Sequence, residues 1–364
     1  MAAPFNPERL EKAGGEVGLI ADVMQSTNGL NSILDLGAAQ VATSASSALA
    51  YLAGGEVPDL IRRLIWVDRT GRVEPVAAPP RPYYVPRVSP DGQRLAVQTL
   101  QSQRRIWVHD LRVPQSLTPV TGPELEAAHP VWTRDGDRIA FTGSPGGRWG
   151  LFWTRADGSQ LPERLSHAEG LKTAPSPASW TRDGRLLFVK GDADVWLLSR
   201  QGNRWVEQAL LASQAYEGDG QVSPDDQWLA YTSVESGRPE IYVRRFPSLA
   251  DRRPVSSEGG REPVWARDGR ELFYIRGSSF DKFELVAHDV SRDGAVATAG
   301  RALFRLAPIR PLTYLPVPGY DVTPDGKRFV FTQYPDAPAA APPNQIHLIL
   351  NWYEELRGKV PAGK

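Results

Sequence analysis

The chain has 364 residues with 42 basic and 42 acidic side chains, so it lacks the strong basic excess of a general nucleic-acid binder. It has no cysteine, which excludes disulfides, thiolate nucleophiles and cysteine metal sites. No segment carries the uninterrupted apolar run of a signal peptide or a membrane span, and we expect no membrane insertion by this chain itself.

The N-terminal region is predicted to close the fold. Residues 1–30 read as a loop followed by a short strand at 16–21. We expect that strand to pair with the last repeat, beside a C-terminal strand at 346–352, because pairing the two chain ends leaves no free sheet edge.

One short motif recurs from there on. Its clear copies each set Asp-Gly or Asp-Asp between a short apolar segment and an alternating apolar one. They are VSPDGQRLAV (88–97), VWTRDGDRIAF (131–141), SWTRDGRLLFV (179–189), QVSPDDQWLAY (221–231), VWARDGRELFY (264–274) and DVTPDGKRFVF (321–331), and a worn copy, VATSASSALAYL, lies at 41–52. Asp and Gly tolerate the positive φ of tight turns, so each copy predicts an antiparallel hairpin.

A third and a weaker fourth strand follow each hairpin, as in IWVHDL (106–111) and SLTPV (116–120). Four strands repeated with a period in the forties are typical of a β-propeller, whose blades must stack around an axis because one blade cannot bury both faces. The predicted fold is therefore all-β, a propeller of four-stranded antiparallel blades forming a single domain over residues 1–364.

The blades are expected within residues 38–353 and are followed by a C-terminal tail at 354–364, with a short helix at 352–358. The expected blades are 38–76, 83–121, 128–167, 175–212, 217–257, 260–307 and 318–353. Seven blades is the preferred number. Six is the alternative, if the worn first motif does not form a full blade.

The run of motifs resembles the TolB-like propeller repeats of bacterial periplasmic proteins, over nearly the whole chain. More narrowly, the order of FNPERL (5–10), RRLIWVDRTGRVEPV (62–76), EGGREPVWARDGRELFY (258–274) and LNWYEELRGKVPAGK (350–364) is similar to the C-terminal propeller of bacterial membrane-anchored serine/threonine protein kinases. That resemblance implies an extracytoplasmic sensor or interaction module of a larger signalling protein. The chain itself has none of the kinase motifs, so the resemblance carries no kinase activity to any residue here.

A second resemblance is to the propeller of prolyl-oligopeptidase-type serine peptidases. The Gly-x-Ser-x-Gly elbow of their hydrolase domain is absent from this sequence. A propeller remnant of such a peptidase is one alternative reading of the chain.

Candidate binding residues precede the inner hairpins, where loops are expected to gather around the mouth of a central channel. They break the repeat with aromatic and charged side chains of the kind enriched in binding hot spots. They are Tyr83, Tyr84, His129, Tyr216, Glu217, Asp219, Arg261, Glu262, Tyr314, Tyr320 and Asp321. The competing interpretation is that they are ordinary polar loop residues.

The sequence thus predicts a non-catalytic propeller that binds a protein, peptide or small molecule at one face, without cofactor, metal or nucleic acid. The alternative from another class is a metal-dependent hydrolase or lactonase-like enzyme. Its divalent metal would be held by carboxylates at the channel mouth, such as Asp219, Glu262 and Asp321.

Overall fold

The computed structural model of the chain consists of two compact units. One unit comprises Ile61–Pro335, and the other comprises Met1–Leu60 with Asp336–Lys364. The structure describes residues 62–100, 103–166, 174–190, 194–277, 282–291, 299–307, 317–333 and 346–359, together with 5–6, 11–12, 20, 23, 25–26, 38–39, 41–44, 47–52, 293 and 296.

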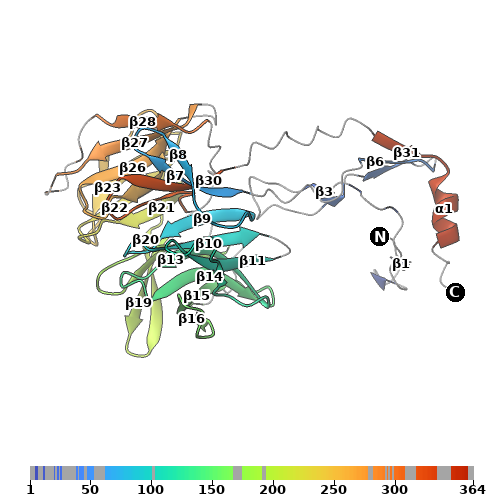
Figure 1. Cartoon of the computed structure of the whole chain (residues 1–364), viewed down its shortest axis with the longest axis horizontal. Helices are drawn as coiled ribbons and strands as arrows, with labels where there is room; N and C mark the ends of the chain where they lie inside the picture. The colour runs from blue at the N-terminus through green and yellow to red at the C-terminus, as the bar shows by residue number, and fades with distance from the viewer. Residues whose placement is uncertain are drawn as a thin grey trace. The chain divides into compact units, whose positions relative to one another are not determined.

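The unit Ile61–Pro335 contains six four-stranded antiparallel sheets among its described residues, which we name blades A to F (Figure 1). Blades A to E each consist of four consecutive strands. Blade A has β9 (Tyr83–Val88), β10 (Arg94–Leu100), β11 (Arg104–Asp110) and β12 (Thr118–Pro119); blade B has β13 (Leu125–Trp132), β14 (Arg138–Pro145), β15 (Gly150–Arg155) and β16 (Glu163–Arg164); blade C has β17 (Ser176–Trp180), β18 (Leu186–Lys190), β19 (Asp194–Gln201) and β20 (Arg204–Leu211).

Blades D and E continue this order. Blade D has β21 (Glu217–Val222), β22 (Trp228–Ser233), β23 (Glu240–Arg245) and β24 (Arg253–Pro254), and blade E has β25 (Arg261–Trp265), β26 (Glu271–Arg276), β27 (Glu284–Asp289) and β28 (Arg301–Arg305). These five sheets confirm the blades predicted from residue 83 to residue 307.

The repeated turn behaves as the sequence predicts. In five of the six copies the Ser or Thr two residues before the turn aspartate donates to its Oδ1, as from Thr133 to Asp135 (2.6 Å) and from Thr323 to Asp325 (2.6 Å). The residue after the aspartate has positive φ throughout, 75° at Gly136 and 60° at Asp226. Positive φ is what glycine and aspartate tolerate best, so the turn chemistry fixes each hairpin.

Blade F is assembled from both ends of its unit. Its inner hairpin is β29 (Asp321–Val322) and β30 (Arg328–Gln333), and its outer strands are β7 (Arg63–Asp68) and β8 (Val73–Pro75). Strand β30 pairs with β7 from Arg328↔Asp68 to Gln333↔Arg63. Figure 1 shows the blue strands β7 and β8 beside the red β30.

Each neighbouring pair of blades encloses its own apolar cluster, so the six sheets form a ring. Ile106 and Phe141 belong to the cluster between blades A and B, and Leu64 and Val97 belong to the one between blades F and A. The clusters between B and C, C and D, D and E, and E and F complete the circle. Burying both faces of every sheet in this way confirms the propeller fold.

The worn first motif forms a hairpin but no four-stranded blade, so the described residues contain six blades, the alternative number that the sequence analysis allowed. Its strands β5 (Val41–Thr43) and β6 (Leu49–Leu52) pair with β31 (Ile346–Ile349) in a three-stranded sheet of the other unit. The C-terminal strand expected in the last blade is therefore β31, and it pairs with β6 instead.

The other unit also contains two short pairs and the predicted C-terminal helix. The pairs are β1 (Phe5–Asn6) with β2 (Glu11–Lys12), and β3 (Gln25–Ser26) with β4 (Ala38–Ala39). Helix α1 spans Trp352–Lys359. Apart from Ile20, the closing strand expected at 16–21 lies outside the described residues, and the ring is closed instead by β7.

Candidate functional site

The inner strands carry bulges at the positions from which most predicted site residues come. The register shifts in β9, β13, β21 and β25. At these shifts four non-glycine residues have positive φ, namely Val85 (45°), His129 (54°), Asp219 (55°) and Glu262 (59°). Each stands six residues before its turn aspartate. Such backbone is costly for these residues and re-aims the side chain, so the surrounding ring must hold it in place.

Asp219 and Glu262 use their bulges to connect neighbouring blades. Asp219 Oδ2 accepts hydrogen bonds from Thr232 Oγ1 (2.8 Å) in its own blade and from the backbone N–H of Glu262 (3.2 Å) in blade E. Glu262 Oε2 in turn accepts from the N–H of Gly319 (2.7 Å), which precedes blade F. The two carboxyl groups thus link three successive blades.

The remaining oxygens of these two buried side chains are unused. Asp219 Oδ1 and Glu262 Oε1 have no hydrogen-bond partner among the described residues, and the side chains are 3% and 1% exposed. Burial raises the pKa of Asp219 to about 6. Burial and the neighbouring Asp219 carboxylate raise the pKa of Glu262 to about 8, so Glu262 is predominantly protonated at neutral pH.

Asp321 and Arg87 form a second connection, between blades F and A. Asp321 accepts from the N–H of Val88 (2.8 Å) through Oδ2 and from that of Val322 (2.8 Å) through Oδ1. The buried Arg87 guanidinium donates to backbone carbonyl oxygens of Pro318 (2.7 Å), Pro86 and Tyr320. Burial lowers the pKa of Arg87, and the charge of Asp321 opposes this shift.

This arrangement gives no support to the divalent-metal alternative. Within the described part of the chain, no group of three His, Cys, Asp or Glu side chains could hold a metal ion. Both carboxylate oxygens of Asp321 accept hydrogen bonds from backbone N–H groups. Asp219 and Glu262 each use one oxygen to accept a hydrogen bond from the backbone of the next blade or of the segment before it. These carboxylates stabilise the ring where a metal site would need them free.

The other predicted residues lie on strands or at strand starts, where the sequence analysis expected open loops. Tyr83, Tyr84, Glu217 and Tyr320 are buried, and Tyr314 lies outside the described residues. Tyr216 is 37% exposed, and Arg261 is half-buried with its Cζ 5.4 Å from the ring centre of Phe283. Tyr216 and Arg261 are thus the least buried of the predicted residues that the structure describes.

His129 is also buried, which fixes its protonation state. Its Nδ1 lies 3.0 Å from Ser176 Oγ in blade C. Burial, and then the positive charges of Arg104 and Arg87, lower the pKa of His129 to about 3. A neutral imidazole in this position serves as another contact between blades.

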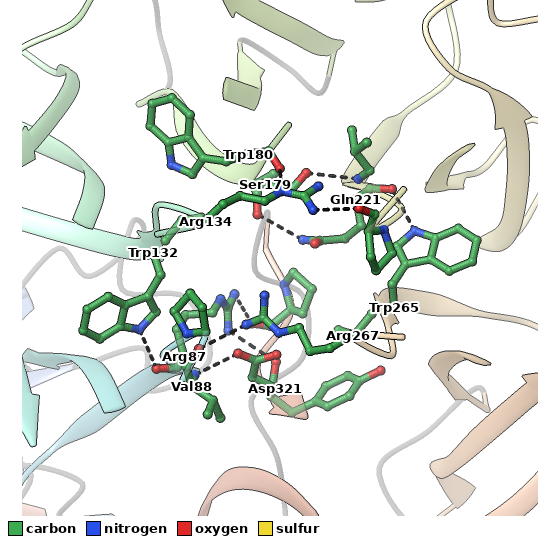
Figure 2. A pocket seen from close by; sticks show the side chains of 18 residues that line it. Arg87, Val88, Trp132, Arg134, Ser179, Trp180, Gln221, Trp265, Arg267 and Asp321 are labelled. Carbon is green, nitrogen blue, oxygen red and sulfur yellow. Dashed lines mark hydrogen bonds between the residues drawn. The ribbon is translucent and has the colours of Figure 1, made fainter. Parts of the chain in front are cut away.

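One accessible feature is a cavity of about 260 Å³ in the central channel (Figure 2). Its lining comes from the inner strands and turns of all six blades. The charged and amide side chains among its lining residues are Arg87, Arg134, Gln221, Arg267 and Asp321. Only Tyr320 and Asp321 belong to both this cavity and the predicted set.

The sequence did contain a signal for the missed residues. Three copies of the motif read Arg-Asp-Gly, which places Arg134, Arg182 and Arg267 just before the turn. The other three copies have Pro90, Pro224 or Pro324 there. Repeated arginines at one level of a ring can converge on its axis, and Arg134 and Arg267 do so (Figure 2).

Tryptophans of the same motif line the cavity and also join neighbouring blades. Trp132 Nε1 donates to the carbonyl oxygen of Arg87 (2.9 Å) in the preceding blade, and Trp265 Nε1 donates to that of Gln221 (3.0 Å). These hydrogen bonds fix the backbone at Arg87 and Gln221, whose side chains line the cavity. The cavity wall is therefore rigidly attached to the ring.

Comparisons with known proteins support the fold. No known family profile matches the chain. A TolB homologue from Chlorobium luteolum is 26% identical over 132 residues, which cover 35% of this chain and only 28% of that relative. A structure assigned as TolB from Agrobacterium tumefaciens matches with a TM-score of 0.59 and 18% identity, over 76% of this chain and 99% of that one.

TolB from Acinetobacter baumannii matches with a TM-score of 0.51 and 18% identity, over 69% of this chain and 66% of that one. The chain is thus TolB-like in fold, as its motifs predicted. In the described residues, no helix has the length and apolar character needed to cross a membrane.

Proposed function

We propose that this chain is a non-catalytic binding propeller whose central channel takes up a peptide, a protein segment or a small molecule. The observation that carries the proposal is the cavity of about 260 Å³ on the ring axis, with arginine and amide side chains in its lining. Pockets with a few convergent polar groups on a rigid scaffold are the usual place for ligand binding.

The chemistry around the channel favours binding over catalysis. The described carboxylates there either accept hydrogen bonds from backbone N–H groups or are buried between blades. His129, the only histidine among the predicted site residues, is neutral and buried. A general acid or base must reach a substrate proton, whereas these groups are buried in the contacts between neighbouring blades. A role as sensor domain of a larger extracytoplasmic signalling protein agrees with this proposal and rests on the sequence resemblance.

Filling the cavity should abolish binding. Gln221 lines the channel and its Nε2 donates to the carbonyl oxygen of Ala178 (3.2 Å). We expect Gln221→Trp to occupy the cavity with an indole and to weaken ligands from a peptide and metabolite panel by more than about tenfold. Binding is measured as a ligand-induced rise in Tm and confirmed by calorimetry.

The matched control is Gln208→Trp on the exposed face of β20, which should bind as the unmodified chain does. Circular dichroism establishes that both variants are folded. Full affinity in Gln221→Trp would place the ligand outside the channel, and conversion of any panel member to product would contradict a non-catalytic role.

A further inference from the structure

Arg267 is the arginine of the cavity lining with the fewest described hydrogen-bond partners. It stands on the turn of blade E, and its Nη2 donates to the carbonyl oxygen of Val88 (3.2 Å) in blade A. No carboxylate of the described residues lies within ion-pair distance of its guanidinium. Its remaining N–H donors are therefore available at the cavity, where Figure 2 shows the side chain reaching inward.

The other two arginines of the lining are already matched. Arg134 pairs with Asp226 (2.8 Å) and also donates to the carbonyl oxygens of Trp180 (2.7 Å), Pro224 (2.9 Å) and Ser223 (3.3 Å). Arg87 donates to three carbonyl oxygens, and Asp321 is the carboxylate that acts most strongly on its charge, although the two form no ion pair. Counting Asp226 and Asp321 against the three arginines leaves one net positive charge at the cavity.

The arginines also act on each other. Burial, and then the positive charges of Arg182 and Arg267, lower the pKa of Arg134, while Asp226 and Asp225 raise it. Like charges held close together on a rigid ring repel one another, and an anion between them relieves that repulsion. A single negative charge is sufficient to balance the cavity.

The shape of the donor group and the size of the cavity define the anion further. A guanidinium presents parallel N–H donors that match the two oxygens of a carboxylate. A cavity of about 260 Å³ lies at the lower limit of small-molecule pockets, which usually begin near ~300 Å³. The fork and the cavity size suit a small oxyanion, and the single net positive charge favours a monocarboxylate over a phosphate dianion.

We propose that the turn end of the channel binds a small monocarboxylate and that Arg267 is the residue that pairs with it. Arg134 and Arg87 hold the surrounding backbone in place, and Arg267 contributes the free donors. This inference rests on the proposed function, because it takes the channel as the binding site and adds the chemical class of the ligand.

The test uses propionate as the probe, with propionamide as its neutral analogue and inorganic phosphate as a second anion, all at one ionic strength. Propionate should raise Tm and give a saturable calorimetric signal, and propionamide should give neither. Arg267→Gln should lose about tenfold or more in propionate affinity. Arg267→Lys keeps the charge but lacks the paired N–H donors, so its propionate affinity should lie between those of Arg267→Gln and the unmodified chain.

The matched control is Arg270→Gln. It removes an equal charge three residues further along the chain, from a side chain that does not line the cavity. It should bind propionate as the unmodified chain does. Equal responses to propionate and propionamide, a phosphate response as large as that to propionate, or unchanged affinity in Arg267→Gln would each overturn the inference.

Failure of this inference can be told apart from failure of the proposed function. If panel ligands bind and are lost in Gln221→Trp but not in Arg267→Gln, the channel is the site and the carboxylate assignment is wrong. If Gln221→Trp leaves panel binding intact, the channel itself is not the site.

Discussion

Phe329→Ala is expected to lower the free energy of unfolding by about 3 to 5 kcal/mol, the usual cost of emptying a buried phenylalanine site. Phe329 lies on β30 and is fully buried in the cluster between blades E and F. Its ring centre is 5.0 Å from that of Phe273 at 83° and 5.8 Å from that of Phe304 at 62°. Edge-to-face partners on two sides leave no neighbour free to fill the space.

The measurement is urea unfolding followed by tryptophan fluorescence and far-ultraviolet circular dichroism. Because Phe329 sits in the blade that closes the ring, both probes should shift to lower urea together. Leu161→Ala is the control, since that side chain is 88% exposed and its loss should change stability by less than about 0.5 kcal/mol. An early transition confined to part of the signal would show that blade F opens by itself, contrary to a ring that unfolds as one unit.

The second large effect is a fall in stability as pH rises above neutrality. Glu262 has a pKa of about 8 in the fold against an ordinary value of 4.5, so the fold favours its protonated form. The stability contributed by the proton is complete below pH 4.5 and is lost as pH rises to 8. We expect the free energy of unfolding to fall by up to about 1.4 kcal/mol per pH unit between pH 6.5 and 8.

That window isolates Glu262 from its titrating neighbours. Asp219, whose pKa rises from 3.8 to about 6, loses its contribution at lower pH. His129, whose pKa falls to about 3, has the opposite sign and destabilises the fold only as pH drops below 6.5. Arg87 and Arg261 face the carboxyl group and lower its pKa, but less than burial and Asp219 raise it.

The measurement is urea unfolding at half-unit pH steps. Glu262→Gln, which keeps an oxygen for the N–H of Gly319, should flatten the profile between pH 6.5 and 8. Glu258→Gln, at an exposed side chain, should keep the slope of the unmodified chain. A flat profile in the unmodified chain over that interval would show that Glu262 is already ionised in the fold.

The repeat could be predicted because its signal is local. Each Asp-Gly turn fixes a hairpin by backbone chemistry, so blades A to E appear where the motif places them. Strand β7 lies within the first expected blade, at 38–76, but it is the third strand of blade F. Its partner was not predictable, because alternation of apolar residues reports a position within a blade but not which distant hairpin completes it.

The candidate site was predicted less well, for a geometric reason. His129, Asp219 and Glu262 break the repeat in the sequence, and this looks the same whether a side chain faces solvent or the next blade. Bulges with positive φ turn these side chains toward the neighbouring blade. The residue types at these positions do not predict a backbone with positive φ. The arginines of the channel were visible in the motif, but their convergence requires the closed ring.

The pairing of β7 with β30 also has a consequence during protein synthesis. Strand β7 leaves the ribosome 260 residues before the first residue of β30, as the separation of Asp68 and Arg328 gives. At about 5–20 residues per second, β7 waits on the order of tens of seconds for its partner. Throughout that time its free edge can pair with other chains nearby, so a chaperone that covers the nascent chain should raise the yield of closed rings.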